Sequence, residues 1–256
     1  MRFARALSLV RYNWPLYAIC LGTIACGIVV TLISSLPVAF RVIACSASVI
    51  AAWYAVASFL AFHMMFDRPE LLSGSWLHRC VADPPKSCTQ ISVCVEETTL
   101  PIESLFPTAH CTNLDLFDDS VMTGPAITRA KKGKETGSVV TRASPDHLPL
   151  KDKSTELTIV TLAAHEVRDQ RLRQKLFKEL ARITEDHGRV VIVEHLRNVP
   201  AALAFGPGLF HFYPRSTWIE LAASTGLNVE SEFDVTPFVH VFVLKHHNTD
   251  SAGFTA

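Results

Sequence analysis

The sequence predicts an α/β domain with an open, mostly parallel sheet, preceded by two membrane-spanning helices. The helices are predicted by two long stretches without a charged residue, 14–40 and 42–62. The sheet is predicted by short β-branched runs that alternate with helical patterns from residue 91 onward. The last two runs follow each other closely before residue 246, which is typical of an antiparallel hairpin.

Each uncharged stretch exceeds the roughly 20 apolar residues that cross a hydrocarbon core as a helix. We therefore expect a tight transmembrane hairpin over residues 1–66 that turns near Pro37 and Arg41. A cleaved signal peptide is the competing interpretation, because Arg2 and Arg5 precede the first stretch. The length of that stretch, its lack of a clear cleavage site and the second stretch after it favour the hairpin.

Positive charges flank the two predicted spans. Three arginines precede the first span and three basic residues follow the second, whereas the turn between them contains Arg41 alone. The positive-inside rule then predicts a protein of the inner or cytoplasmic membrane whose soluble domain faces the cytoplasm. Small residues at spacings of four, with Gly22 and Ser48 among them, are typical of close helix contacts, although ordinary lipid-facing positions explain them equally well.

Charge and cysteine content restrict the function classes. The chain has 24 lysines and arginines against 24 aspartates and glutamates, so no basic excess points to nucleic acid as a partner. Cys80, Cys88, Cys94 and Cys111 lie outside the predicted spans and lack the paired spacing of a zinc site. In a cytoplasmic domain we expect them to be free thiols.

Prolines and a glycine interrupt the pattern after the spans, and they predict a linker over residues 67–88 with one short helix near Trp76. The domain then covers residues 89–246, which is enough chain to bury a single core. The polar residues 247–256 are expected to form a disordered tail. Within the domain we expect strands at 91–95, 112–117, 138–142, 157–163, 189–194, 228–235 and 238–245.

Two helices of the domain are predicted with clear ends. Residues 169–185 place Leu176, Leu180 and Ile183 at helical spacing, and Gly188 is suited to the left-handed position after the helix. Residues 214–225 form a second amphipathic pattern that stops before Gly226.

Polar side chains follow four of the predicted strands, at the point where each strand ends. The carboxyl ends of parallel strands open onto the ligand-binding crevice of such sheets. We therefore expect an enzyme-like site at this edge. The residues at these strand ends are Glu96, Glu97, Asp115, His165, Glu166, Glu194 and His195.

Three segments carry a resemblance to a known family. They are Leu114-Asp115-Leu116 with Met122 after it, Leu148-Pro149-Leu150 before the fourth expected strand, and the run 188–194 that follows the helix around Phe177. Over most of residues 90–245 the chain resembles a divergent class I S-adenosylmethionine-dependent methyltransferase. The resemblance implies a Rossmann-like sheet closed by an antiparallel hairpin, with S-adenosylmethionine as the cofactor.

The resemblance also implies cofactor-binding positions. Asp115 matches the acid that accepts hydrogen bonds from the two ribose hydroxyls of the cofactor. Asp118, Asp119 and Asp146 are nearby alternatives for binding the cofactor, although helix capping explains Asp118 or Asp119. The family usually has an acid after the third strand. Here Ser144 stands at that position, and Asp146, which we assign to the cofactor site in its place, follows two residues later.

The turn after the first strand departs from the family. There the family has a glycine-rich turn that lets the backbone approach the cofactor. Here Glu96 and Glu97 follow the strand without a glycine. The two carboxylates could bind the amino group of S-adenosylmethionine, yet they would repel its carboxylate unless one of them were protonated or paired.

Histidines beside carboxylates are the candidates for acid–base catalysis: His165 with Glu166, and His195 with Glu194. A histidine titrates near neutral pH, and a carboxylate can orient it or raise its pKa. Adjacent residues on a strand point to opposite faces, so we expect the useful pairs to form across strands. The same groups could hold a divalent metal or be hydrogen-bonded structural histidines, and because no ligand spacing is diagnostic we assign no metal site.

The connection 196–213 is apolar and aromatic, and Gly206-Pro207-Gly208 interrupts it. By resemblance to methyltransferases with lipophilic substrates, this connection is expected to cover the substrate. The residues expected to bind substrate are Phe205, Phe210, His211 and Tyr213. Burial against the helix that contains Trp218 is the alternative.

These features predict a membrane-anchored methyltransferase-like enzyme that acts on a lipophilic small molecule, such as a quinone or a lipid, and that could form homo-oligomers. The same fold and cofactor could also serve a different reaction. The alternative class is a degenerate methyltransferase fold without catalysis that acts as a membrane-tethered binding or scaffold module.

Overall fold

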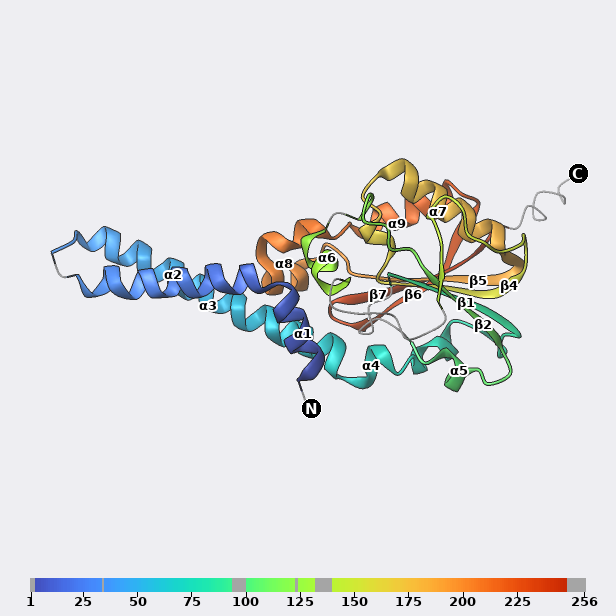
Figure 1. Ribbon diagram of the computed structural model, residues 1–256, viewed down its shortest axis with the longest axis horizontal. Coiled ribbons are helices and arrows are strands. Elements are labelled where there is room, and N and C mark those ends of the chain that lie inside the picture. Colours follow the sequence, from blue (N-terminus) through green and yellow to red (C-terminus); the bar gives the residue numbers. More distant parts are fainter. Residues whose placement is uncertain (1–2, 34, 94–99, 123, 132–139, 248–256) are drawn as a thin grey trace, which may run out of the picture. The chain divides into compact units, whose positions relative to one another are not determined.

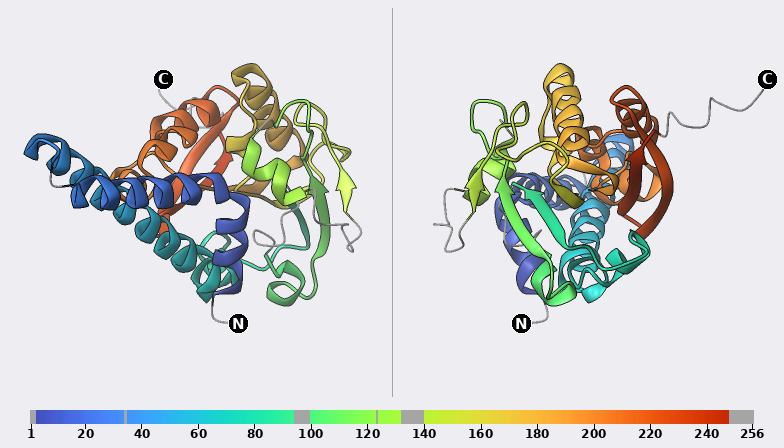
Figure 2. Two further views of the ribbon diagram at one scale, coloured as in Figure 1. Left: turned by 60° about the vertical axis from the view of Figure 1, so that its left-hand side comes forward. Right: turned by 90° about the vertical axis from the view of Figure 1, so that its right-hand side faces the viewer.

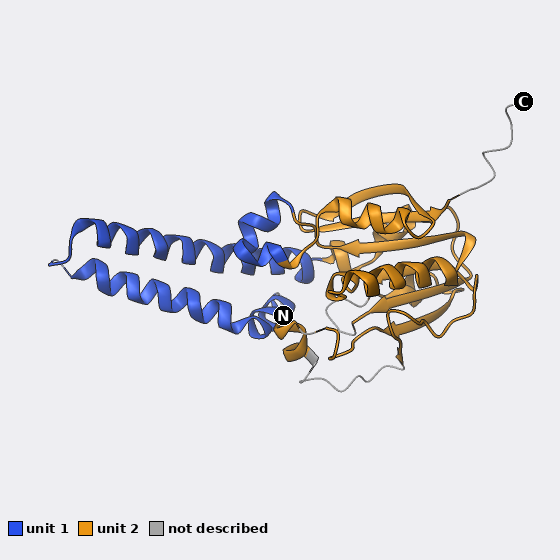
Figure 3. Ribbon diagram, turned by 90° about the horizontal axis from the view of Figure 1, so that it is seen from above, with its two compact units in different colours: residues 1–68, 198–210 blue, residues 69–197, 211–256 orange. Residues whose placement is uncertain are grey.

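The structure is a computed structural model that describes residues 3–33, 35–93, 100–122, 124–131 and 140–247. The chain divides into two compact units: residues 1–68 with 198–210, and residues 69–197 with 211–256 (Figure 3). Two residues of the expected cofactor site, Glu96 and Glu97, lie outside the described residues, as does nearly all of the expected tail 247–256.

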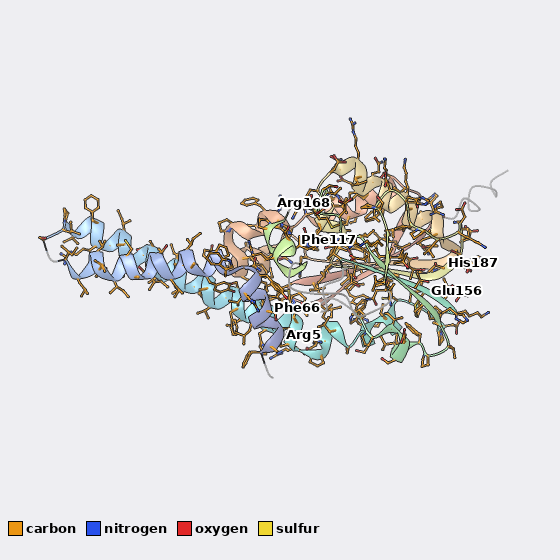
Figure 4. The ribbon with its side chains drawn as sticks, in the orientation of Figure 1. Arg5, Phe66, Phe117, Glu156, Arg168 and His187 are labelled. Atoms are coloured by element: carbon orange, nitrogen blue, oxygen red, sulfur yellow. A yellow bond between two sulfur atoms is a disulfide. The ribbon has the colours of Figure 1, made fainter. Side chains whose placement is uncertain are left out.

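The first unit is helical. It contains α1 (Ala4–Tyr12), α2 (Trp14–Leu32), α3 (Val38–Phe62), the π-helix η1 (His63–Asp67) and α8 (Val199–Phe205). The backbone N–H of Arg5 donates to Asp67 Oδ1 at 3.0 Å, and the Arg5 guanidinium donates to the carbonyl oxygen of Phe66 at 3.2 Å (Figure 4). The start of α1 and the end of η1 therefore lie at the same end of the helical hairpin.

Helices α2 and α3 are candidates for membrane spans, because each is long and apolar enough to cross a bilayer by length and composition. In each, only 11% of the most apolar window is buried. The core helices of a soluble domain are mostly buried, so these two helices differ from them. Their exposed apolar side chains include Leu21, Leu32, Ile43 and Ile50.

Small residues bring α2 and α3 into close contact. A Cβ atom on Gly27 would lie 2.8 Å from the carbonyl oxygen of Ala44 and would overlap Ser48 Oγ. Further along the pair, Tyr17 and Ser58 are joined by a hydrogen bond of 2.9 Å between their hydroxyl groups. Of the two interpretations left open for Gly22, close helix contact does not hold, because a Cβ there would meet nothing within 4 Å. The helix contact is made at Gly27 instead.

The second unit is built on a seven-stranded sheet with the order β3-β2-β1-β4-β5-β7-β6 (Figure 1). Strands β1 to β5 run parallel to one another, and β7 is antiparallel to both β5 and β6. This topology confirms the predicted sheet with its closing antiparallel hairpin. The strands are β1 (Ser87–Ser92), β2 (His110–Asp115), β3 (Thr141–Arg142), β4 (Thr155–Thr161), β5 (Thr184–Glu194), β6 (Leu227–Thr236) and β7 (Val239–His246).

The first strand begins earlier than its expected start at residue 91, because β1 buries polar side chains that no apolar pattern reveals. Thr89, Gln90 and Ser92 are all buried. The hydroxyl groups of Thr89 and Thr155 are 3.1 Å apart, which joins β1 to β4 by a side-chain hydrogen bond. Buried polar groups are tolerated where they find such partners.

Two longer helices lie side by side on one face of the sheet, α7 (Gln170–Ile183) and α9 (Arg215–Ala223) (Figure 2). The Asp169 carboxylate caps α7 by accepting from the N–H of Leu172 at 2.7 Å. Gly226 follows α9 with a φ of +81°, as its position in the sequence predicts. The core between helices and sheet contains Leu114, Val160, Leu176, Phe177, Leu180, Ile192 and Trp218.

The prediction for Gly188 is wrong. Helix α7 ends at Ile183, and Gly188 lies inside β5. A Cβ atom at this position would come within 2.7 Å of the carbonyl oxygen of Glu156 on β4. The missing side chain therefore allows close packing of two strands rather than a left-handed turn.

Short helices complete the second unit. They are α4 (Pro69–Leu72), the 3-10 helix η2 (Ser75–Arg79), α5 (Ile102–Leu105), α6 (Pro125–Lys131) and the 3-10 helix η4 (Ala164–Glu166). A further 3-10 helix, η5 (Gly206–His211), begins in the first unit and ends in the second. The segment expected to be a linker contains two of them. Leu71, Trp76 and Leu77 are buried there, and the Trp76 indole N–H donates to the carbonyl oxygen of Leu71 at 2.9 Å.

The expectation of free thiols is wrong for one pair of cysteines. Cys88 and Cys111 stand directly opposite each other on the neighbouring parallel strands β1 and β2, and they form a disulfide. Only the register of the sheet brings these two residues together, since 23 positions separate them in the chain. Cys80 is buried and free, and burial raises the pKa of its thiol to about 12.

Candidate active site at the carboxyl ends of the central strands

A group of titratable side chains gathers where β4 and β5 end in the second unit. Leu162, with a φ of +48°, follows β4 and turns the chain into η4, which carries His165 and Glu166. Glu194 is the last residue of β5, and His195 follows it. All four of these titratable residues are buried, and the half-buried His211 joins them from the connection before α9.

Glu194 pairs across the strands with His165 and not with its own neighbour His195. Its carboxylate has no exposed surface, and Oε2 lies 2.6 Å from His165 Nδ1. The other oxygen accepts from the backbone N–H of His165 at 3.1 Å. Both carboxylate oxygens are thus satisfied by one residue, which holds the His165 ring in a single orientation.

Glu166 bridges two histidines. Its Oε1 lies 3.5 Å from His165 Nε2 and 3.3 Å from His211 Nε2. Its Oε2 is buried and has no hydrogen-bond partner among the described residues. A Cβ atom on Gly124 would lie 3.3 Å from this oxygen, so a residue without a side chain borders it. Unpaired buried carboxylate oxygens are costly, and one in a strand-end cluster is a candidate contact for a ligand.

Arg168 is a member of this cluster that the sequence did not single out. Its guanidinium donates to the carbonyl oxygen of His211 at 2.8 Å, and a second terminal nitrogen lies 2.7 Å from His211 Nε2 (Arg168 is labelled in Figure 4). Its place three residues after His165 is the one signal that could have identified it. The charge of Arg168 contributes to the lowered pKa of His211.

The protonation states of the cluster differ from those of isolated side chains. Burial alone would lower the pKa of His165, but the attraction of Glu194 and the hydrogen bond with Glu166 outweigh burial and raise it to about 10. Burial would raise the pKa of Glu166, yet hydrogen bonds with His165 and His211 hold it well below its usual range. Burial lowers the pKa of His211, and it lowers that of His195 to about 4 with help from the nearby His165.

His195 has the contacts of a structural histidine. Its Nδ1 lies 2.8 Å from the carbonyl oxygen of Phe238, to which it donates. Its ring packs against Phe212, with 4.9 Å between the ring centroids. The alternative of a hydrogen-bonded buried histidine therefore describes His195 better than it describes His165.

The acid expected to bind the cofactor lies at the end of β2. Asp115 is buried, and its Oδ1 accepts from the N–H of Phe117 at 2.9 Å. A cavity of about 430 Å³ begins two residues later at the ends of β2 and β3 (Phe117 is labelled in Figure 4). Its lining residues are Phe117, Asp118, Asp119, Arg142, Ala143 and Ser144.

The other acids near this cavity have local partners. Asp118 Oδ1 accepts from the backbone N–H of Ser120 at 2.8 Å and from its hydroxyl at 2.6 Å, as the capping alternative expects of a turn residue. Asp146 accepts from the Ser144 hydroxyl at 2.6 Å and pairs with Lys175 of α7 at 3.2 Å. These contacts lower the pKa of Asp146, and they tie its carboxylate to the surface of α7.

The four residues expected to bind substrate fall into two different units. Phe205 and Phe210 belong to the first unit, whereas His211 and Tyr213 belong to the second. Within the first unit, the Phe205 ring lies 5.6 Å from that of Phe62 on α3. Within the second unit, Tyr213 packs 5.7 Å from the Trp218 ring, which is the burial that the alternative interpretation expects.

Comparisons with known proteins agree with the fold of the second unit. Residues 90–192 match the family profile described as "Methyltransferase domain". No curated protein sequence matches the chain. A crystal structure of a SAM-dependent methyltransferase from Aquifex aeolicus is similar, with a TM-score of 0.52 and 16% identity over 69% of this chain and 91% of that one. At this identity the similarity establishes the fold alone.

Two further solved structures are similar at lower scores. A type 11 methyltransferase from Sulfolobus solfataricus has 21% identity and a TM-score of 0.45, covering 66% of this chain and 88% of its own. The Burkholderia thailandensis 1,6-didemethyltoxoflavin-N1-methyltransferase, solved with bound 1,6-didemethyltoxoflavin and S-adenosylhomocysteine, has 12% identity and a TM-score of 0.49, covering 78% of this chain and 87% of its own.

Proposed function

Because residues 90–192 belong to a domain of the class I methyltransferase family, we propose that the protein is an S-adenosylmethionine-dependent methyltransferase anchored in a membrane, with a lipophilic small molecule as its methyl acceptor. The observation that carries the proposal is the buried Oε2 of Glu166 at the carboxyl ends of the central strands, which has no hydrogen-bond partner in the described part of the chain. In open α/β sheets this edge is where ligands bind.

The residues at the end of β2 fit a nucleoside cofactor. Asp115 offers a carboxylate where the family binds the ribose hydroxyls. The adjoining cavity of about 430 Å³ lies in the usual size range of small-molecule sites, roughly 300–1,000 Å³. Phe117 adds a flat apolar surface to its wall. When bound, S-adenosylmethionine supplies an electrophilic methyl group on a positively charged sulfur.

The acid–base cluster is suited to hold the acceptor molecule. Glu166 is ionised, because its pKa lies well below its usual range. Its Oε2 can accept a hydrogen bond from an O–H or N–H group of the acceptor and stabilise the positive charge that develops on the acceptor atom as the methyl group arrives. His165 and Glu194 keep the carboxylate in place through its other oxygen. Much of the rate acceleration then comes from positioning.

The apolar surface of the first unit supports a membrane anchor and a lipophilic substrate. Helices α2 and α3 expose apolar side chains along their length. In the same unit Val199, Leu203 and Phe210 are exposed around α8. Exposed apolar surface of this extent is typical of contact with lipid. A methyl acceptor that partitions into the bilayer would be concentrated at such a protein.

Calorimetric titration of the full chain in lipid nanodiscs tests the cofactor. We expect saturable binding of S-adenosylmethionine and S-adenosylhomocysteine, and we expect Asp115→Ala to abolish it. Asp186→Ala is the matched control, because Asp186 is exposed and pairs with Lys153 near the opposite end of β5. No heat with either ligand at millimolar concentration would contradict the proposal and favour the scaffold alternative.

Carbonate extraction of cell membranes tests the anchor. We expect the full chain to stay in the membrane pellet at high pH, because two spans of this length are not released by disrupting charge interactions. Release into the supernatant would show that α2 and α3 do not span a bilayer.

A further inference from the structure

We propose that His165, Glu166 and His211 form a binding site for a divalent transition-metal cation, with zinc as the ion of best fit. One ligand atom from each of these residues lies within 4.8 Å of the other two. The proposal goes beyond methyl transfer, because the site is defined by its ligand geometry and is tested without S-adenosylmethionine.

The distances around Glu166 fit the coordination sphere of zinc. Ligand atoms bonded to zinc at about 2.0–2.2 Å and at the tetrahedral angle stand about 3.3–3.6 Å apart. Glu166 Oε1 lies 3.5 Å from His165 Nε2 and 3.3 Å from His211 Nε2. Two distances between ligand atoms therefore already suit a zinc ion.

Glu194 provides the outer contact that histidine ligands of metals usually have. A ligating histidine donates its second ring N–H to a carboxylate or carbonyl group, which fixes its tautomer and raises its basicity. His165 Nδ1 is 2.6 Å from Glu194 Oε2, and its backbone N–H donates to Glu194 Oε1. With Nδ1 engaged by Glu194, Nε2 is the ring nitrogen of His165 that faces Glu166.

Two carboxylates of the cluster can balance the charge of a bound cation. Glu166 and Glu194 bring two carboxylates into a buried cluster, and Glu166 Oε2 has no partner among the described residues. Arg168 is the competing positive charge, because its guanidinium lies 2.7 Å from His211 Nε2. Metal uptake would displace that contact, while the bond from Arg168 to the His211 carbonyl oxygen can remain.

The ligand set selects the class of metal. Two imidazoles and one carboxylate suit zinc and neighbouring transition metals, whereas magnesium and calcium prefer ligand sets made of oxygen alone. Three protein ligands also leave a fourth position open, which is the arrangement of catalytic rather than structural zinc sites. An oxygen atom of a small molecule could fill that position.

Titration of the chelator-treated full chain in nanodiscs with Co²⁺ tests the site, because tetrahedral cobalt has visible absorption bands. We expect one equivalent to bind and Zn²⁺ to displace it. Outer-shell changes cost about 10–100-fold in metal affinity, so Glu194→Gln should weaken binding by that factor. Glu166→Gln and His211→Gln should each weaken it by more than about 100-fold.

His240→Gln is the matched control. His240 also has two carboxylate neighbours, but Glu232 lies at Nε2 and Asp234 at Nδ1, so one ion cannot join all three residues. We expect cobalt binding to be unchanged in this variant. Arg168→Gln should bind cobalt at least as tightly as the wild type, because it removes the competitor of the ion.

Circular dichroism and S-adenosylmethionine calorimetry on the same variants separate loss of the site from loss of folding. His211→Gln is expected to keep its fold and cofactor binding while it loses cobalt. Retained one-to-one cobalt binding in both Glu166→Gln and His211→Gln, or no cobalt binding by the wild type, would overturn the metal site. Neither result would bear on cofactor binding, which depends on Asp115.

Discussion

Replacing Glu194 by glutamine should destabilise the second unit strongly. The Glu194 carboxylate is completely buried, and both of its oxygens contact His165. Removing one partner of a buried pair of this kind costs about 3–5 kcal/mol, because the remaining group loses its compensation. A more exposed carboxylate provides the scale: Glu232→Gln, which loses its contacts with Arg215 and His240, should destabilise the unit much less.

A double-mutant cycle isolates the interaction between the two residues. We expect Glu194→Gln and His165→Phe together to destabilise the unit by less than the sum of the single changes. Residues in contact of this kind couple by about 0.5–3 kcal/mol, and the short Nδ1–Oε2 distance of 2.6 Å favours the upper half of that range.

Urea unfolding of the full chain in nanodiscs, with chelator present, provides the measurement. Hydrogen exchange of peptides from β4 and β5, detected by mass spectrometry, reports the stability of the second unit directly. If the destabilisation of the double variant equalled the sum of the two single destabilisations within about 0.5 kcal/mol, the reasoning would be refuted. Such additivity would mean that the buried pair contributes no specific interaction.

Three further changes test the packing. Gly27→Val should separate α2 from α3, because its side chain would overlap Ser48, and cross-linking of cysteines placed at the two ends of the helices should fall. Gly188→Val should lower the urea midpoint by the equivalent of about 1–3 kcal/mol, since its Cβ would clash with a β4 carbonyl oxygen, and an unchanged midpoint would contradict the assigned strand. Glu179→Gln should cost about 1–2 kcal/mol at neutral pH through its bond to Arg182. The hydrogen bond with Arg182 lowers the pKa of Glu179 in the folded state. The difference in stability between the wild type and Glu179→Gln should therefore be complete above pH 4.5 and shrink as the pH falls below that value. A difference that persists at acid pH would disprove the role of the Glu179 charge.

Sequence patterns located the candidate site but not its internal contacts. The positions of His165, Glu166 and Glu194 at the ends of β4 and β5 followed from the β-branched runs before them. Arg168 was missed because it lies beyond the strand end, and its partner His211 is 43 residues further along the chain. The sequence also grouped Phe205 and Phe210 with His211, although the chain passes from one unit to the other between residues 210 and 211.

Sequence alone therefore determined the alternation of strands and helices, the two apolar helices and the edge of the sheet where polar groups gather. These features depend on the side-chain periodicity of neighbouring residues, which each segment carries by itself. Tertiary structure decided which groups meet: Glu194 with His165, Glu166 with His211 and Cys88 with Cys111. Such contacts depend on strand order and register, and these are set only when distant segments bury their apolar faces together.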